Sequence, residues 1–183
     1  MIACLRVVRD VSLDGGGSPP PGGTGARIPP PSLLPQGGGM VLRLVFVGGI
    51  SELYRELEEY YLTRLRSILK TELLEVPESR AAAPERRLRE EAARIRKLLR
   101  GKVYVTDAKG TLVDDDFMLR LVKSSTYDDV SIVVGGPYGV APEVEGERIS
   151  FSKLTFPHDL FRVMLLEQLY RQALTLRGVR YKK

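Results

Sequence analysis

Cysteine and histidine are almost absent from this chain, and their scarcity excludes several kinds of chemistry. The one cysteine, Cys4, lies in an unusual N-terminal stretch, so the remainder has no thiol for a disulfide, a zinc site or a nucleophile. The one histidine, His158, would leave a transition-metal site to be built almost wholly from carboxylates. No loop has the carboxylate spacing of a magnesium or calcium site. We therefore expect no metal site.

Long apolar runs are also missing. The longest candidate, residues 41–50, is interrupted by Arg43 and two glycines, and it falls short of the roughly 18–20 apolar residues of a membrane span. We therefore expect a soluble, cytoplasmic protein. Its 183 residues, 43% hydrophobic and 28% charged, are sufficient for one domain with its own core.

The net charge of +5 is concentrated near the chain ends. Residues 40–176 hold 21 basic and 21 acidic side chains. Beyond them, Arg177, Arg180, Lys182 and Lys183 form a basic tail with no acidic residue. Such a tail attracts phosphate groups locally, although a frayed, solvated chain end has the same composition. The charge alone leaves both interpretations open.

Residues 1–39 contain 9 of the 18 glycines and 7 of the 12 prolines. A segment of this composition buries too little apolar surface to order itself, and we expect a disordered Gly/Pro-rich extension. A predicted strand follows directly after Met40. Two interpretations remain open: the natural start is Met40 and residues 1–39 are mis-assigned upstream sequence, or the extension is genuine.

From Met40 onward, strand and helix patterns alternate. Predicted strands cover residues 41–48, 71–78, 102–107 and 129–136. Predicted helices begin at Ser51, near Pro84, at residue 114 and at Pro157. This order predicts an α/β fold with a mostly parallel sheet flanked by helices, in which ligands bind beyond the carboxyl ends of the strands.

For two of these helices, the residue pattern predicts the character of one face. The first has one apolar stripe, made of Leu53, Leu57, Tyr60, Tyr61, Leu65 and Ile68. The second has a basic run, made of Arg86, Arg87, Arg89, Arg94, Arg96 and Lys97. Glutamates and alanines interleave that run, which favours a solvated face over one that binds nucleic acid.

The segment "VVGGPYGV", residues 133–140, places glycines directly after the most apolar strand. Glycines there let a ligand approach the backbone closely. No Lys-Ser or Lys-Thr follows Gly139, so this is no phosphate-binding P-loop, and it lacks the glycine spacing of a dinucleotide-binding turn. A tight structural turn and a ligand loop both remain possible.

The last helix is apolar nearly all round, which indicates burial on more than one side or at a subunit interface. We expect its charges to pair along the helix, Asp159 with Arg162 and Glu167 with Arg171. Before it, residues 150–156 form a predicted loop of alternating polar and apolar side chains. For His158, in the first turn, we expect a role in capping the helix and fixing this loop.

The segments "VVGGPYG", "SFSKLTFPHDLFRVMLLEQLYRQALTLRG" and "RYKK" together closely resemble the large-subunit ribosomal RNA pseudouridine N3-methyltransferases of the SPOUT superfamily. The likeness covers residues 40–183. It implies a SPOUT methyltransferase domain with a trefoil knot near the C-terminus, and a homodimer. The reaction implied is methyl transfer from S-adenosyl-L-methionine to N3 of a pseudouridine in large-subunit ribosomal RNA, and we expect the enzyme to act on the assembled ribosome.

The resemblance also implies the site. The cofactor-binding positions would be Thr106, Gly135, Gly136, Phe151, Ser152, Lys153, Leu154, Thr155 and Phe156. Tyr181, Lys182 and Arg162 would be catalytic, and Arg171, Lys182 and Lys183 would bind RNA. Two positions depart from the family pattern: Thr106 replaces a common leucine, and Lys182 replaces a histidine of the tail.

Two alternatives accompany this hypothesis. One keeps the SPOUT fold but changes the RNA target, which the altered tail allows. The other is a non-catalytic ribosome-binding module that retains a cofactor pocket.

Overall fold

The computed structural model describes residues 40–179 and residue 181. The predictions made for residues 1–39, Lys182 and Lys183 lie outside the described residues. The strands are β1 (Leu42–Val47), β2 (Thr71–Val76), β3 (Lys102–Leu112), β4 (Val130–Val134) and β5 (Glu147–Ser150). The helices are α1 (Glu52–Arg66), α2 (Pro84–Arg96), α3 (Asp115–Ser124) and α4 (His158–Leu176).

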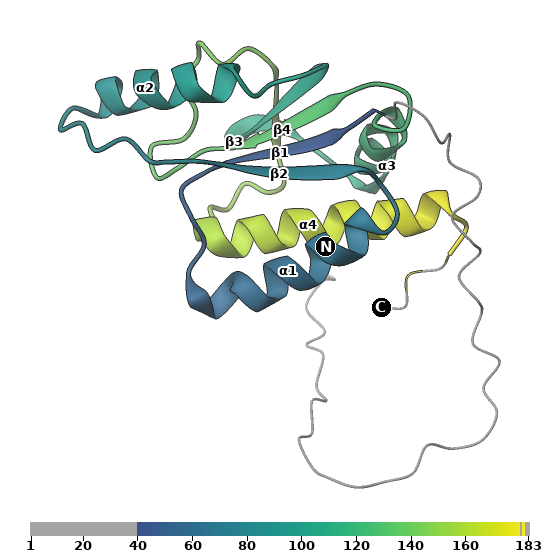
Figure 1. Ribbon diagram of the computed structural model, residues 1–183. Coiled ribbons are helices and arrows are strands. Elements are labelled where there is room, and N and C mark those ends of the chain that lie inside the picture. Colours follow the sequence, from purple (N-terminus) through teal and green to yellow (C-terminus); the bar gives the residue numbers. More distant parts are fainter. Residues whose placement is uncertain (1–39, 180, 182–183) are drawn as a thin grey trace, which may run out of the picture. The chain divides into compact units, whose positions relative to one another are not determined.

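The five strands form one sheet in the order β2-β1-β4-β3-β5, and every neighbouring pair is parallel (Figure 1). Short apolar strands separated by helices favour this arrangement, because each crossover returns the chain to the same edge. The predicted α/β class is confirmed. All carboxyl ends of the strands therefore lie along one edge of the sheet. The trefoil knot stays a prediction.

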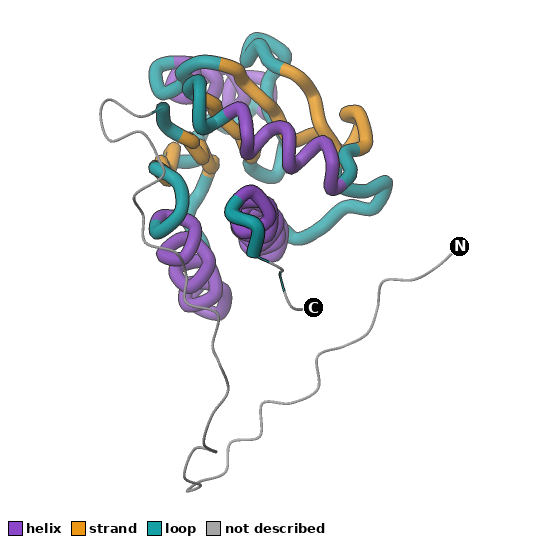
Figure 2. Tube along the Cα trace, turned by 90° about the vertical axis from the view of Figure 1, so that its right-hand side faces the viewer, coloured by secondary structure: helices purple, strands orange, loops and turns teal. Residues whose placement is uncertain are grey.

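The helices cover both faces of the sheet. In Figures 1 and 2, α1 and α4 lie side by side on one face, and α2 lies on the other. Successive side chains of β1 point to opposite faces of the sheet, so the hydrophobic core has two parts. Leu44 and Phe46 belong to the cluster packed with α1, α3 and α4, whereas Val45 and Val47 belong to the cluster packed with α2. Both clusters are fully buried at β1, which makes this strand central to the fold.

The predicted apolar stripe of α1 is partly wrong. Leu65 and Ile68 are buried, but Leu53, Leu57 and Tyr60 are exposed. The buried positions of α1 are Glu58, Leu62 and Leu65. A hydrophobic pattern alone could not predict this buried face of α1. Glu58 is buried there because it pairs with Arg162, a charged residue of α4.

The sequence also missed β5 and half of β3. We predicted a strand over residues 102–107 and a loop from Ser150, whereas β3 continues to Leu112 and pairs with β5. The register between these strands shifts between Thr106 and Thr111, so the alternation of side chains that marks a strand is broken there. The other predicted strands and helices are confirmed within two residues at most boundaries.

None of the helices in the described part of the chain is long and apolar enough to cross a membrane.

Candidate functional site

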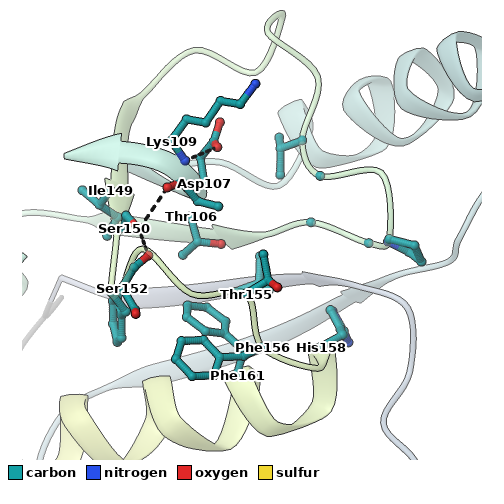
Figure 3. A pocket seen from close by; sticks show the side chains of 18 of the residues that line it. Thr106, Asp107, Lys109, Ile149, Ser150, Ser152, Thr155, Phe156, His158 and Phe161 are labelled. Carbon is teal, nitrogen blue, oxygen red and sulfur yellow. Dashed lines mark hydrogen bonds between the residues drawn. The ribbon is translucent and has the colours of Figure 1, made fainter. Parts of the chain in front are cut away.

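A cavity of about 640 Å³ opens at the carboxyl edge of the sheet, beside β3, β4 and β5 (Figure 3). Three segments line it: residues 106–109 of β3, residues 134–140 after β4, and residues 149–156 after β5, of which Lys153 alone does not reach the cavity. His158 and Phe161 of α4 complete the wall. The cavity thus lies where an open parallel sheet binds its ligands.

The glycine loop after β4 is a tight turn as well as a cavity wall. The amide of Gly139 donates to the carbonyl of Gly136 at 2.9 Å, and Gly139 has a φ of +79°. A Cβ on Gly135 would lie 2.4 Å from the carbonyl oxygen of Gly139. Only glycine fits at position 135, because the turn folds back onto it. The segment is therefore a tight structural turn that also lines the cavity.

Hydroxyl groups hold the loop after β5 in shape. The Ser150 hydroxyl donates to the carbonyl of Ser152 at 2.7 Å and lies 3.4 Å from that of Ala108 on β3. The Ser152 hydroxyl accepts from the amide of Leu154 at 3.0 Å. These short-range bonds tie the loop to the neighbouring strand (Figure 3). The side chain of Leu154, although it lines the cavity, is 71% exposed.

Aromatic rings form the apolar floor. Phe151 and Phe161 meet edge to face, with ring centroids 5.2 Å apart, and Phe156 lies beside Phe161 in Figure 3. Such pairs give a rigid apolar surface against which a flat ring can pack. The cavity can therefore take a ligand with an aromatic or aliphatic part.

Polar groups line the same cavity in small number. Asp107 accepts from the amide of Lys109 at 2.9 Å, and both side chains belong to the lining. The Thr106 hydroxyl is already used, since it donates to the carbonyl of Val133 at 3.1 Å. The Nε2 atom of His158 is buried and has no hydrogen-bond partner among the residues that the structure describes. A buried nitrogen without a partner is a group that a ligand can satisfy.

Asp159 positions His158 from outside the cavity. Its carboxylate accepts from the amide of Ser51 at 3.1 Å and lies 3.4 Å from Nδ1 of His158. Partial burial acts to raise the pKa of Asp159, but the hydrogen bonds from Ser51 and His158 outweigh it and lower the pKa. The ionised carboxylate thus links the start of α1 to the start of α4. Pro157 is the N-cap of α4 and no side-chain hydrogen bond caps this helix, so the predicted capping role of His158 is wrong, and its role in fixing the loop stays a prediction.

Arg162 lies outside this cavity. Its side chain is fully buried, with Nε 2.7 Å and Nη2 3.0 Å from the carboxylate of Glu58. Nη2 also donates to Glu75 at 2.7 Å, and Nη1 donates to the carbonyl of Gly48 at 3.1 Å. The predicted pair of Asp159 with Arg162 is wrong, because the guanidinium points away from its own helix turn to α1 and β2.

Tyr181 lies beside the C-terminal half of α4 and near Tyr61 of α1. Its ring centroid is 6.1 Å from that of Tyr170 and 4.9 Å from the guanidinium carbon of Arg171. Arg171 also donates to Glu167 at 2.6 Å, which confirms the predicted pair. Burial, then the nearby carboxylate of Glu167, raises the pKa of Tyr181 far above its ordinary value. The phenol therefore stays protonated at neutral pH and can donate a hydrogen bond.

The predicted residues thus divide into two groups. Of the nine predicted cofactor-binding residues, the cavity brings together all except Lys153. The predicted catalytic and RNA-binding residues that are described, Arg162, Arg171 and Tyr181, lie elsewhere. Asp107 and Lys109 were missed, although the rule that ligands bind beyond the carboxyl ends of strands would have found them. Within the described ranges, no cluster of three metal-ligating side chains is present.

Known proteins resemble this chain over nearly all of its described length. A family model described as "Predicted SPOUT methyltransferase" matches residues 40–182. A protein of Caldicellulosiruptor saccharolyticus named "Ribosomal RNA large subunit methyltransferase H" is 34% identical over 154 residues, which cover 78% of this chain and 100% of that protein. Proteins of the same name from Anaeromyxobacter dehalogenans and Alkalilimnicola ehrlichii are 39% and 38% identical, each over 79% of this chain and at least 99% of the relative.

Proposed function

This chain belongs to the SPOUT methyltransferase family, and from that premise we propose that it methylates N3 of a pseudouridine in large-subunit ribosomal RNA with S-adenosylmethionine as methyl donor. The name of its relatives supports a large-subunit rRNA substrate. The observation that carries the proposal is the cavity at the carboxyl edge, in which three segments that are far apart in sequence meet.

The residues present fit this donor. A volume of about 640 Å³ lies within the range of roughly 300–1,000 Å³ usual for small-molecule sites. The pair of Phe151 and Phe161 offers an apolar surface for an adenine ring, and the charged side chains of Asp107 and Lys109 match an amino acid moiety with both charges. The unpartnered Nε2 of His158 supplies a polar contact. These features support binding by Thr106, Gly135, Gly136 and residues 151–156 other than Lys153.

In this reaction the protein has to align the reacting groups and let the N3 proton leave. The bound donor would supply a methyl group on a positively charged sulfur. The rigid turn at Gly135 and the serine-tied loop after β5 would hold the reacting groups in line. The N3 proton must leave to a base or to water. Tyr181 does not fill that role at neutral pH, because its raised pKa keeps the phenol protonated.

A homodimer is part of the proposal. Along α4, Phe161 at the cavity and Arg171 beside Tyr181 are about 15 Å apart at 1.5 Å per residue. A tail that takes part in the reaction therefore does not reach the cavity of its own chain from this position. We propose that it serves the cavity of a second copy. In this proposal, the dimer works in the cytoplasm on assembled ribosomes.

His158→Ala should lower the affinity for S-adenosylmethionine by about fivefold to tenfold, the effect of losing one hydrogen bond. The rate at saturating donor should change much less. Calorimetry and a methylation assay on the purified dimer measure the two quantities. Lys153→Ala is the matched control, because Lys153 is exposed and lies in the same loop without lining the cavity. A His158 variant that is folded and saturable with donor but inactive would contradict this role.

The proposed function is tested with labelled S-adenosylmethionine and large ribosomal subunits that lack the modification. Label incorporated into rRNA at a pseudouridine is the expected result. Label at another nucleotide would favour the alternative of a different RNA target. Folded protein that fails to bind the donor in calorimetry would favour the non-catalytic module.

A further inference from the structure

A hollow lined by arginines lies next to the methyl-donor cavity on the same edge of the sheet. It has a volume of about 530 Å³ and is lined by three arginines, two glutamates and two smaller residues: Arg80, Arg86, Arg94, Glu78, Glu90, Pro77 and Ala81. An adjoining hollow of about 470 Å³ is lined by Arg80, Arg87 and the glycines after β1. We call Arg80, Arg86, Arg87 and Arg94 the arginine cluster.

Most of the cluster lacks a carboxylate partner. Arg86 pairs with Glu90 at 2.9 Å. Among the described residues, no ion pair includes Arg80, Arg87 or Arg94. Arg94 donates to the carbonyl of Pro77 at 2.7 Å and Arg87 donates to that of Ala81, so both guanidinium groups are oriented by neutral backbone. Their positive charge is therefore available to an anion.

Glu90 and Glu91 are occupied by hydrogen bonds, whereas the carboxylate of Glu78 also lines both hollows. Ser79 donates from its amide to Glu91 at 2.8 Å and from its hydroxyl to Glu90 at 2.6 Å. The hydrogen bonds from Ser79 and then Arg86 lower the pKa of Glu90. These carboxylates hold residues 77–81 against α2 and shape the hollow. Residues 77–100 together carry eight basic and four acidic side chains, although residues 40–176 as a whole are balanced.

The cluster is continuous with the donor cavity. The guanidinium carbon of Arg87 lies 5.5 Å from the ring centroid of Tyr138, and Tyr138 lines the cavity. A Cβ on Gly136, also in the cavity wall, would lie 3.3 Å from Val47 at the end of β1. In the sheet order β2-β1-β4-β3-β5, the hollows adjoin the ends of β2 and β1, and the cavity adjoins the ends of β4, β3 and β5.

We propose that the arginine cluster binds the phosphodiester backbone of the RNA strand that carries the target base. Planar guanidinium groups without carboxylate partners bind phosphate oxygens in pairs, which suits this position. The arginine cluster then holds the RNA strand along the sheet edge while the target base enters the cavity beside Tyr138. This inference rests on the proposed function for the identity of the RNA. It reverses the expectation of a merely solvated face on α2.

The double substitution Arg80→Gln with Arg94→Gln tests the inference. The KM for large ribosomal subunits should rise about tenfold, while kcat and the affinity for S-adenosylmethionine stay within about twofold. Loss of two phosphate contacts should also reduce the slope of log(kcat/KM) against log salt concentration by about 1 to 2.

Arg66→Gln with Arg120→Gln is the matched control, since it removes the same charge from exposed arginines elsewhere. Arg66 likewise donates to a backbone carbonyl, that of Thr71, at the amino end of β2. Arg120 lies on α3 beside Phe117. Equal effects of the two double variants would overturn the inference.

Binding to a labelled single-stranded RNA oligonucleotide, measured by fluorescence anisotropy, separates this inference from the proposed function. Binding that depends on Arg80 and Arg94, in a protein that transfers no methyl group, would support the inference and refute the function. Methyl transfer that does not depend on the arginine cluster would support the proposed function and refute the inference. If the cluster variant lost affinity for ribosomal subunits but not for RNA, the hollow would bind a ribosomal protein and the inference would fail.

Discussion

Arg162→Met should lower the free energy of unfolding by about 3–5 kcal/mol, the range for breaking a buried ion pair from one side. Arg162 is fully buried, and it pairs with Glu58, Glu75 and the carbonyl of Gly48. Its guanidinium carbon also lies 4.7 Å from the ring centroid of Phe46. Removing it leaves the carboxylate of Glu58 buried without its cation. Urea denaturation monitored by circular dichroism measures the loss.

The double variant Arg162→Met with Glu58→Leu should recover most of this stability, because an apolar pair of similar volume replaces the ion pair. A loss below about 1 kcal/mol in the single variant would contradict a structural role for the pair. The prediction that Arg162 is catalytic has a separate test. If a folded variant bound donor normally and transferred no methyl group, a catalytic role would be favoured over the structural one.

Gly135→Ala should reduce the affinity for S-adenosylmethionine by at least about tenfold. The added Cβ would lie 2.4 Å from the carbonyl oxygen of Gly139 and 2.7 Å from a methyl carbon of Val140. The turn must open to admit it, and this turn forms one wall of the donor cavity. Calorimetric titration of the purified protein with S-adenosylmethionine measures the effect.

Gly49→Ala is the control for that substitution. A Cβ at Gly49 would meet no atom within 4 Å, and φ at this position is not in the left-handed region. We expect donor affinity within about twofold of the wild type. Normal affinity in Gly135→Ala would show that the glycine loop does not hold the donor.

The loops that line the cavity were predictable because their signals are local, whereas their assignment to cofactor binding came from the family resemblance. Glycines directly after an apolar strand, and polar residues directly before a helix, mark loops at the carboxyl edge of a parallel sheet. The cavity indeed unites Gly135, Gly136 and the loop from Phe151 to Phe156, except for Lys153. The α/β class followed from the alternation of strand and helix patterns in the same way.

The features that sequence reasoning missed depend on contacts between distant residues. Glu58 and Arg162 are 104 positions apart, and no helical spacing indicates that they pair. The buried face of α1 follows from that pair, which is why Leu53 and Leu57 are exposed instead. Three arginines of the cluster, Arg86, Arg87 and Arg94, were expected on a solvated face for the same reason. The role that we propose for the arginine cluster depends on the hollow that Arg80 and Arg94 share and on the contact of Arg87 with Tyr138.

The most direct test of the proposed activity is mass spectrometry of large-subunit rRNA from a strain in which the gene is deleted, compared with the same strain complemented by residues 40–183. We predict that N3-methylpseudouridine is absent after deletion and returns on complementation. Survival of the modification in the deletion strain would contradict this prediction.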